Sequence, residues 1–362
     1  MNEIKGLTGL RGVAALWVFF LHATWGWTGD SVSMKLARAG GTGVGVFFVL
    51  SGFILSYVYA DKFASHSIGY GKFMFARISR VYPLHLVTLL VYGTLGAAGL
   101  LLLLPQDNHY TFILNLGLLQ AWGFTDLVSW NEPAWSISTE LFAYLLFPFL
   151  IGPLTKAGWR MLIAAACLCG VWLTVFPYNY LVHWLQAIGF VSTGRHQFAY
   201  GYSLTMFFGV FMAGCVAFCV MRKLGPKMTP AVSDATALAG VALLVWWCIR
   251  ANGDIMPWQF TLGSVLVVAG LSGDSGIGKM LFGNDVAFFL GKISYALYLS
   301  ALLTEAVVVR FVWPVPLWLN LSAALVSATI LHYGVEKPAQ SWLKGLRRAT
   351  PEPVQFNGDV VR

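Results

Sequence analysis

The sequence predicts an all-α membrane protein that folds as a single bundle of about ten transmembrane helices. Of its 362 residues, 58% are hydrophobic and only 10% are charged, whereas soluble domains carry about 25% charged residues. Apolar runs of about 20 residues, long enough to cross a bilayer, recur along the whole chain. This composition excludes a soluble globular domain, a disordered chain and a disulfide-rich secreted fold.

Ten of the apolar runs each predict one spanning helix. They cover residues 10–27, 40–60, 83–104, 135–154, 159–176, 201–220, 235–251, 256–272, 286–310 and 316–335. A shorter run at 111–124 predicts an interfacial or re-entrant segment. The first run lacks an A-x-A-like cleavage site and a second span follows it, so we interpret it as a retained helix rather than a signal peptide.

Basic residues predict the orientation of the bundle. With the N-terminus in the cytoplasm, 17 of the 23 lysines and arginines fall in cytoplasmic segments and five fall outside. This bias predicts an N-in and C-in topology. The net charge of +8 is therefore interpreted as a topology signal and not as a nucleic-acid surface. We expect residues 1–340 to form the membrane domain and residues 341–362 a cytoplasmic tail.

Tryptophans flank several of the predicted spans and support their boundaries. Near the outer interface lie Trp25, Trp27, Trp122, Trp130, Trp135, Trp313 and Trp318, and near the inner one Trp159 and Trp342. They are typical of an aromatic belt at the membrane surface. The alternative is that some of the outer rings stack on a sugar.

Arg11 and His22 are an ionisable pair inside the first run, where charge is expensive and usually functional. Eleven helical steps bring His22 to within about 20° of the face that carries Arg11 and about 16 Å further along the axis. A phosphate-bearing ligand at Arg11 would need an arm of about 16 Å to reach His22, which is about the reach of the pantetheine of coenzyme A. The alternative is a snorkelling arginine and an unrelated histidine.

Further motifs follow in order along the chain. Besides the R-x10-H spacing, they include W-S-x-S-x-E at 135–140, S-Y-x-x-Y-L at 294–299 and E-x-P at 336–338. A glycine-rich block at 43–53 and a basic block at 73–83 lie between the R-x10-H motif and the W-S-x-S-x-E motif. In this set and order, residues 7–338 resemble the acyltransferase 3 family of membrane-bound O-acyltransferases.

The resemblance implies a multi-pass enzyme of the bacterial cytoplasmic (inner) membrane. Such an enzyme moves an acyl group, usually acetyl, from acyl-CoA to a hydroxyl. Family acceptors are mostly cell-surface glycans such as exopolysaccharide, O-antigen or peptidoglycan, and some are lipochito-oligosaccharides or macrolides. Gly45 departs from an acidic residue common in the family. Ser300 and Ala301 stand where a histidine usually follows the S-Y-x-x-Y-L block, which leaves His22 as the predicted general base.

Arg77 and Arg80 are the other predicted donor-binding residues. They lie three residues apart, so one helical face can present both guanidiniums, which match phosphate oxygens. Lys292 is a weaker member of the same predicted acyl-CoA site. The alternative for Arg77 and Arg80 is a topology signal that also contacts anionic lipid.

Glu140 is the second predicted catalytic residue, close to the outer end of its span. It would orient the imidazole of His22 or hold acceptor hydroxyls, and the alternative is a structural partner for another polar group. For the serines among the predicted substrate-binding residues, the alternative is a role in helix packing. The predicted substrate-binding residues are Ser51, Trp135, Ser136, Ser138 and Tyr295.

The sequence indicates no metal site. His332 and Glu336 lie four residues apart, but two ligands do not make a site, so Glu336 is interpreted as a structural anchor. The expected partners are acyl-CoA, a glycan or lipid-linked glycan, and membrane lipids, but no nucleic acid. The sequence leaves the oligomeric state open, and also whether transfer is direct or passes through a covalent relay. Alternative functions are a transporter or flippase without chemistry and a small-molecule acyltransferase.

Overall fold

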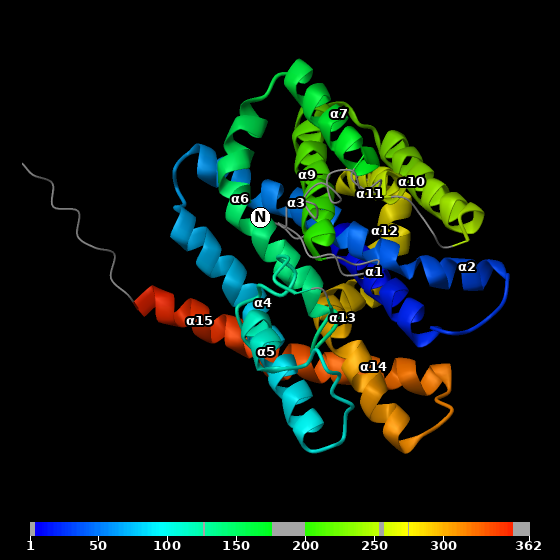
Figure 1. Cartoon of the computed structure of the whole chain (residues 1–362). Coiled ribbons are helices and arrows are strands. Elements are labelled where there is room, and N and C mark those ends of the chain that lie inside the picture. Colours follow the sequence, from blue (N-terminus) through cyan, green and yellow to red (C-terminus); the bar gives the residue numbers. More distant parts are fainter. Residues whose placement is uncertain (1–3, 126, 176–199, 253–256, 274, 350–362) are drawn as a thin grey trace, which may run out of the picture.

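The computed structural model describes residues 4–125, 127–175, 200–252, 257–273 and 275–349, and its regular secondary structure over these residues is entirely helical. The helices pack side by side in one bundle (Figure 1). Eight of them are long and apolar enough to cross a membrane. The prediction of an all-α membrane protein is therefore confirmed.

The helices follow one another through short connections. The helices that reach a membrane-spanning length, alone or with a direct continuation, are α1 (Lys5–Ala23), α3 (Thr42–Ala64), α4 (Tyr70–Ala97), α6 (Ala134–Lys156), α9 (Tyr200–Leu224), α10 (Pro230–Arg250), α13 (Asp285–Phe311) and α14 (Leu317–Leu331). The others are α2 (Val32–Arg38), α5 (His109–Leu116), α7 (Trp159–Val175), α11 (Pro257–Ser272), α12 (Gly276–Phe282) and α15 (Lys337–Ala349).

Each of the ten predicted spans overlaps a helix. Eight of them meet the length of a membrane span, the last because α14 continues without a break as far as Gly345 in α15. The α7 and α11 helices fall short of this length. The α11 helix is followed by α12 in a sharply bent pair, which together would count as a ninth span. The short run at 111–124 is the eight-residue helix α5 followed by turns.

The predicted bounds of the first span, 10–27, are wrong by about one helical turn. The α1 helix begins at Lys5 and ends at Ala23. The Thr24 hydroxyl donates to the Phe20 carbonyl, and Gly26 follows with a φ of +83°, a left-handed conformation that ends helices. Hydropathy could not show this end, because the residues beyond it are also apolar.

The predicted start of the third span, at residue 83, is also wrong. The α4 helix begins at Tyr70 and continues through Pro83, so the basic block is part of the helix and not a loop before it. Its arginines lowered the hydropathy of this turn in the sequence. They are accommodated within the bundle because Arg77 and Arg80 line a cavity that also contains Glu140, described below.

Glycines bring α1 and α13 into close contact. A Cβ atom on Gly12 would lie 2.6 Å from the backbone nitrogen of Gly291, so neither position tolerates a side chain without a shift of the helices. One turn earlier, a Cβ on Gly9 would meet the side chain of Ala287. The two contacts follow the same chain direction in both helices, so α1 and α13 run parallel to each other.

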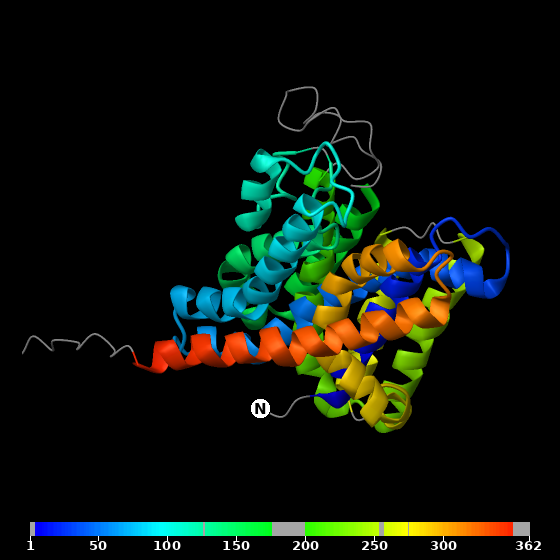
Figure 2. The same ribbon diagram turned by 90° about the horizontal axis from the view of Figure 1, so that it is seen from below.

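The C-terminal helices form one long rod, seen in orange to red across the bundle in Figure 2. The α14 helix passes through a π-helical turn, His332–Glu336, directly into α15. The expected domain boundary at residue 340 falls inside α15, and residues 350–362 of the expected tail lie outside the described residues. Such π-helical turns often occur at functional sites.

Candidate functional site

A cavity of about 130 Å³ lies in the bundle between α1, α3, α4, α6 and α13. Seven of the predicted site residues line it. They are Arg11, Ser51, Arg77, Arg80, Ser136, Glu140 and Tyr295. These residues come from five helices and are separated by up to 284 positions in the sequence, so only the tertiary fold brings them together. We refer to this space as the inner cavity.

The inner cavity carries an excess of positive charge. Among the described residues that line it, three are arginines and one, Glu140, is a carboxylate, and a second carboxylate, Glu336, lies 3.8 Å from Arg80, so the arginines outnumber the carboxylates around them by one. Buried charge without a partner is costly. The cavity is therefore suited to an anionic ligand.

Arg77 is held by an aromatic residue but keeps an unused donor. One of its terminal nitrogens donates to the Tyr59 hydroxyl at 3.0 Å, and the guanidinium lies over the Tyr59 ring, 5.2 Å from its centre. The Nε atom of Arg77 is buried and has no hydrogen-bond partner within the described chain. A buried donor without a partner is rare in folded proteins. The atom is enclosed by the protein, so a ligand in the cavity would reach it only if the Arg77 side chain turned.

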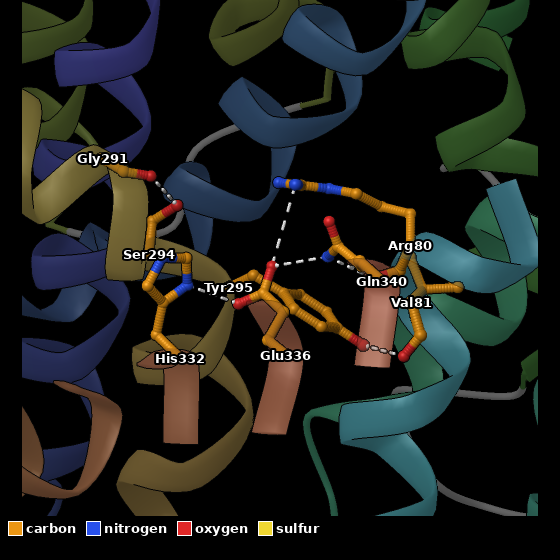
Figure 3. Close-up of polar contacts among 8 residues, drawn as sticks. All are labelled: Arg80, Val81, Gly291, Ser294, Tyr295, His332, Glu336 and Gln340. Carbon is orange, nitrogen blue, oxygen red and sulfur yellow. Dashed lines mark hydrogen bonds and ion pairs between the residues drawn. The ribbon is translucent and has the colours of Figure 1, made fainter. Parts of the chain in front are cut away.

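Arg80 is oriented by a network on the C-terminal rod (Figure 3). Its guanidinium lies 3.8 Å from Oε1 of Glu336, a carboxylate that is only 1% exposed. The other oxygen of Glu336 contacts Nδ1 of His332 at 2.8 Å, and the Gln340 amide donates to Oε1 at 3.2 Å. The π-helical turn contains both His332 and Glu336. The predicted anchoring role of Glu336 thus has a structural basis, and its partner is Arg80.

Tyr295 joins α13 to α4 beside this network. Its hydroxyl donates to the carbonyl of Val81 at 2.6 Å (Figure 3). The neighbouring Ser294 donates to the Gly291 carbonyl at 2.8 Å, within its own helix. Tyr295 therefore fixes the wall of the inner cavity directly after Arg80 in α4.

Glu140 is fixed from two helices. The Ser51 hydroxyl in α3 donates to Oε1 of Glu140 in α6 at 2.5 Å. Tyr144, one turn further along α6 and buried, is in polar contact with both residues. Glu140 also lies close enough to Arg11 to act on its charge. The carboxylate is therefore a fixed negative charge facing the arginines.

His22 does not line the inner cavity. It lies in the last turn of α1 and is half-buried, whereas the predicted bounds placed it in the middle of a span. One unbroken helix carries both Arg11 and His22, as the spacing predicted. Since Gly12 abuts Gly291 in the parallel helix α13, ten further residues place His22 about level with Ala301.

Three other predicted residues lie outside the inner cavity. Trp135 packs against the ring of Phe207, with ring centres 5.2 Å apart. Ser138 is fully buried and donates to the Leu118 carbonyl at 2.7 Å, which ties the α5–α6 connection to α6. Lys292 is exposed, and its ammonium lies over the Phe288 ring.

Sequence reasoning missed three tyrosines of the site. Tyr59 holds Arg77, Tyr144 faces Glu140, and Tyr298 lines the cavity and hydrogen-bonds to Ser136. For Tyr144 a signal was present, since it stands four residues after Glu140 and so shares its helical face. Tyr59 offered no such signal, because its partner lies on another helix.

The part of the chain that the structure describes contains no group of three or more histidine, cysteine, aspartate or glutamate side chains that could hold a metal ion. The ionisable groups of the inner cavity are instead arginines, one glutamate and tyrosines. The residues present are therefore suited to binding an organic anion.

The fold and the inner cavity define a membrane protein with a cavity lined by charged side chains inside its helix bundle. Comparison with known proteins makes the class specific. The family model described as "Acyltransferase domain" matches residues 4–335, so the chain belongs to the acyltransferase 3 family. This membership confirms the predicted resemblance.

Relatives support the same activity. The chain is 27% identical to the acyltransferase MdmB of Streptomyces mycarofaciens, over 97% of this chain and 96% of that protein. It is 25% identical to a protein of Staphylococcus aureus (strain COL) to which O-acetyltransferase activity is provisionally assigned, over 83% of this chain but only 50% of that protein. No solved structure matches the chain. The protein is a membrane-embedded O-acyltransferase.

Proposed function

We propose that the protein transfers an acyl group, in the first instance acetyl, from acyl-CoA to a hydroxyl of a cell-surface or exported glycan. One observation carries the donor assignment: three arginines converge on a buried cavity that contains a single carboxylate. Coenzyme A supplies the phosphates that such a cavity would bind, because guanidiniums match phosphate oxygens in geometry and charge.

The dimensions of α1 fit this donor. Arg11 and His22 are about 16 Å apart along one helix, and pantetheine is an arm of about that length. With the phosphates at Arg11, Arg77 and Arg80, the thioester would lie at the level of His22. The unpartnered Nε of Arg77 would donate to a phosphate oxygen once the side chain turned toward it.

In the reaction, Nε2 or Nδ1 of a neutral His22 takes the proton from the acceptor hydroxyl. The hydroxyl oxygen attacks the thioester carbonyl, the carbon–sulfur bond breaks, and the proton passes from the imidazolium to the leaving thiolate. Glu140, fixed by Ser51, opposes the charge of Arg11. Because only the neutral imidazole accepts a proton, the rate should fall at acidic pH.

The charge bias of the loops supports the orientation. We place the N-terminus and residues 341–362 in the cytoplasm, where most basic residues then lie. The protein would reside in the bacterial cytoplasmic membrane. Arg77 and Arg80, near the start of α4, would then meet acyl-CoA from the cytoplasmic side, and the acceptor would enter from the opposite side.

The test uses the purified full chain in liposomes with labelled acetyl-CoA and isolated surface polysaccharide. His22→Asn should reduce transfer by at least about 10²-fold without weakening acyl-CoA binding. The matched control is His66→Asn, which changes a histidine in the turn after α3 and should leave transfer unchanged. Full activity in His22→Asn would contradict the proposed base. Label that crosses the membrane without becoming bound to the glycan would indicate transport instead.

Two further measurements complete the test. Mass spectrometry of the surface polysaccharide from cells with and without the gene should show acyl groups only when the protein is present. Rapid mixing with acetyl-CoA in the absence of acceptor distinguishes direct transfer from a covalent relay. A burst of released coenzyme A would indicate an acyl-enzyme, and its absence would indicate direct transfer.

A further inference from the structure

A second cavity, of about 470 Å³, lies between α4, α13 and the connection that leads into α6. We call it the outer cavity. Its polar lining residues are Tyr92, Gln106, Asp107, Trp130, Asn131 and Glu132. Its apolar wall consists of Leu104, Leu127, Val128, Leu302, Leu303 and Ala306. No function proposed so far uses this space.

Three side chains in the outer cavity have polar groups to spare. Within the described chain, the Tyr92 hydroxyl, the Gln106 amide and the Glu132 carboxylate form no hydrogen bond with another side chain or with the backbone. They come from α4, from the loop after it and from the connection that leads into α6, and all three line the same space. This arrangement offers donors and acceptors together, as a hydroxyl-rich ligand requires.

The loop that carries these groups is held rigidly. The Asp107 carboxylate accepts from the backbone nitrogens of Trp130 and Leu104. The Asn131 amide donates to the Leu299 carbonyl of α13 at 3.0 Å. Trp130 itself has a φ of +57°, a left-handed conformation that is unfavourable for a bulky residue and that such contacts must maintain. Strained residues of this kind cluster at ligand sites.

The charge and shape of the lining restrict the kind of ligand that the outer cavity can bind. Among the described lining residues, two are carboxylates and none is basic, so an anionic ligand would be repelled. The Trp130 and Tyr92 rings lie 6.2 Å apart and edge-on, next to the aliphatic wall of α13. One apolar face opposite several polar groups complements a pyranose, which has a face of C–H groups and a rim of hydroxyls.

The outer cavity is stacked on the inner cavity along one seam between α6 and α13. On the α6 side, Glu132 lines the outer cavity, and Ser136 and Glu140 line the inner one. On the α13 side, Leu302 belongs to the outer cavity and Tyr298 to the inner one. Along α13, the four residues from Tyr298 to Leu302 rise about 6 Å, so a single turn of this helix separates the two spaces. Glu132 lies in the connection two residues before α6 begins at Ala134.

Tyr298 and Ser136 are the lining residues of the inner cavity that lie nearest, along the chain, to the outer-cavity residues Leu302 and Glu132, and we refer to them as the Tyr298–Ser136 partition. The two side chains are in polar contact, and the Ser136 hydroxyl also donates to the Pro133 carbonyl at 3.0 Å. His22 lines neither cavity. Counted from the Gly12–Gly291 contact, it is about level with Ala301, in the turn of α13 that runs from Tyr298 to Leu302.

We propose that the outer cavity is a binding site for a pyranose unit of the acceptor, either neutral or amino-substituted but never anionic. The proposal rests on the proposed acyl transfer and extends it. The sugar hydroxyl to be acylated points along the seam toward the Tyr298–Ser136 partition. The donor thioester arrives at the same partition from the inner cavity. Donor and acceptor thus occupy two cavities of opposite charge.

The experiment measures sugar binding separately from transfer. Saturation-transfer NMR on the full chain in nanodiscs is recorded with methyl pyranosides of gluco, galacto and manno configuration, each as the neutral, 2-amino and uronate form. Neutral or amino forms should bind and the uronates should not. Ala306→Trp, which fills the cavity from an exposed position, should abolish binding, and Glu132→Gln should weaken it about tenfold.

The matched control is Glu305→Gln, which changes a carboxylate at the same end of α13 that does not line the cavity and faces Asn320 instead. It should bind the pyranosides as the wild type does. Thermal unfolding of each variant verifies that it is folded. Binding of the uronates, no binding of any pyranoside, or undiminished binding in Ala306→Trp would each overturn the proposal.

Transfer from acetyl-CoA is assayed on the same preparations. Pyranoside binding in the outer cavity without any acyl transfer would contradict the proposed function and not the sugar site. Acyl transfer that proceeds equally well in Ala306→Trp would contradict the sugar site and not the function. Glu132→Lys provides a gain-of-function arm, since it should admit the uronates that the wild type rejects.

Discussion

The inner and outer cavities differ in both charge and degree of internal bonding. The inner cavity gathers three arginines, two of which contact protein partners, Tyr59 and Glu336. The outer cavity has two carboxylates and no basic residue among the described residues that line it. In the outer cavity, Asp107 and Asn131 form hydrogen bonds with the surrounding protein. The three side chains there with polar groups to spare form none within the described chain.

This difference indicates how one bundle can serve two substrates. An anionic donor gains most from charges fixed in advance, because the protein then need not reorganise around it. A hydroxyl-rich acceptor gains from several unpaired donors and acceptors on rigid loops. A single turn of α13 separates the two environments.

The largest expected effect concerns the charge of the inner cavity. Arg77→Ala should raise KM for acyl-CoA about 30-fold, because it removes a charge-assisted contact and the unpartnered Nε donor. KM for the acceptor should stay within about twofold of the wild type. Steady-state kinetics with both substrates varied provides the measurement. An equal change in the two constants would show that the cavities do not divide the substrates.

The second effect acts through the C-terminal rod. Glu336→Gln should raise KM for acyl-CoA about tenfold, because the neutral amide no longer orients Arg80. It should also lower the melting temperature of the purified protein, since His332 and Gln340 lose a buried partner. Gln340→Leu, which removes only one amide contact, is the milder comparison. A variant that melts earlier but binds acyl-CoA normally would restrict Glu336 to a purely structural role.

A third, smaller effect concerns the partition. Tyr298→Phe keeps the ring that packs on Phe47 but removes the hydroxyl that contacts Ser136. Hydrolysis of acyl-CoA without acceptor should increase about threefold, since water passes more easily between the cavities. Release of coenzyme A in the absence of glycan measures this leak. An unchanged leak would mean that another residue separates the two spaces.

The smallest effect is expected at Lys292. The sequence placed it in the donor site, but the structure leaves it exposed beside Phe288 and outside the cavity lining. Lys292→Ala should therefore change KM for acyl-CoA by less than about twofold. A change as large as that of Arg77→Ala would mean that the donor extends beyond the inner cavity along α13.

The sequence by itself determined the fold class and much of the inner cavity. Composition and run length predicted every span, because a bilayer demands long apolar helices wherever the chain crosses it. The cost of charge in a membrane singled out Arg11, Glu140 and the basic block, because such groups are retained where they face a polar interior. Hydropathy did not predict the helix ends at Ala23 and Tyr70, since it is averaged over several residues.

Only the tertiary structure decided which of these groups meet. Side chains that lie far apart in the chain, such as Arg80 and Glu336, share a contact because α4 packs beside the C-terminal rod. The same packing left Trp135, Ser138 and Lys292 outside the inner cavity. The outer cavity has no motif at all, since α4, α13 and a loop each contribute only part of its wall. A helical period reports which face a residue occupies, but only packing determines what that face touches.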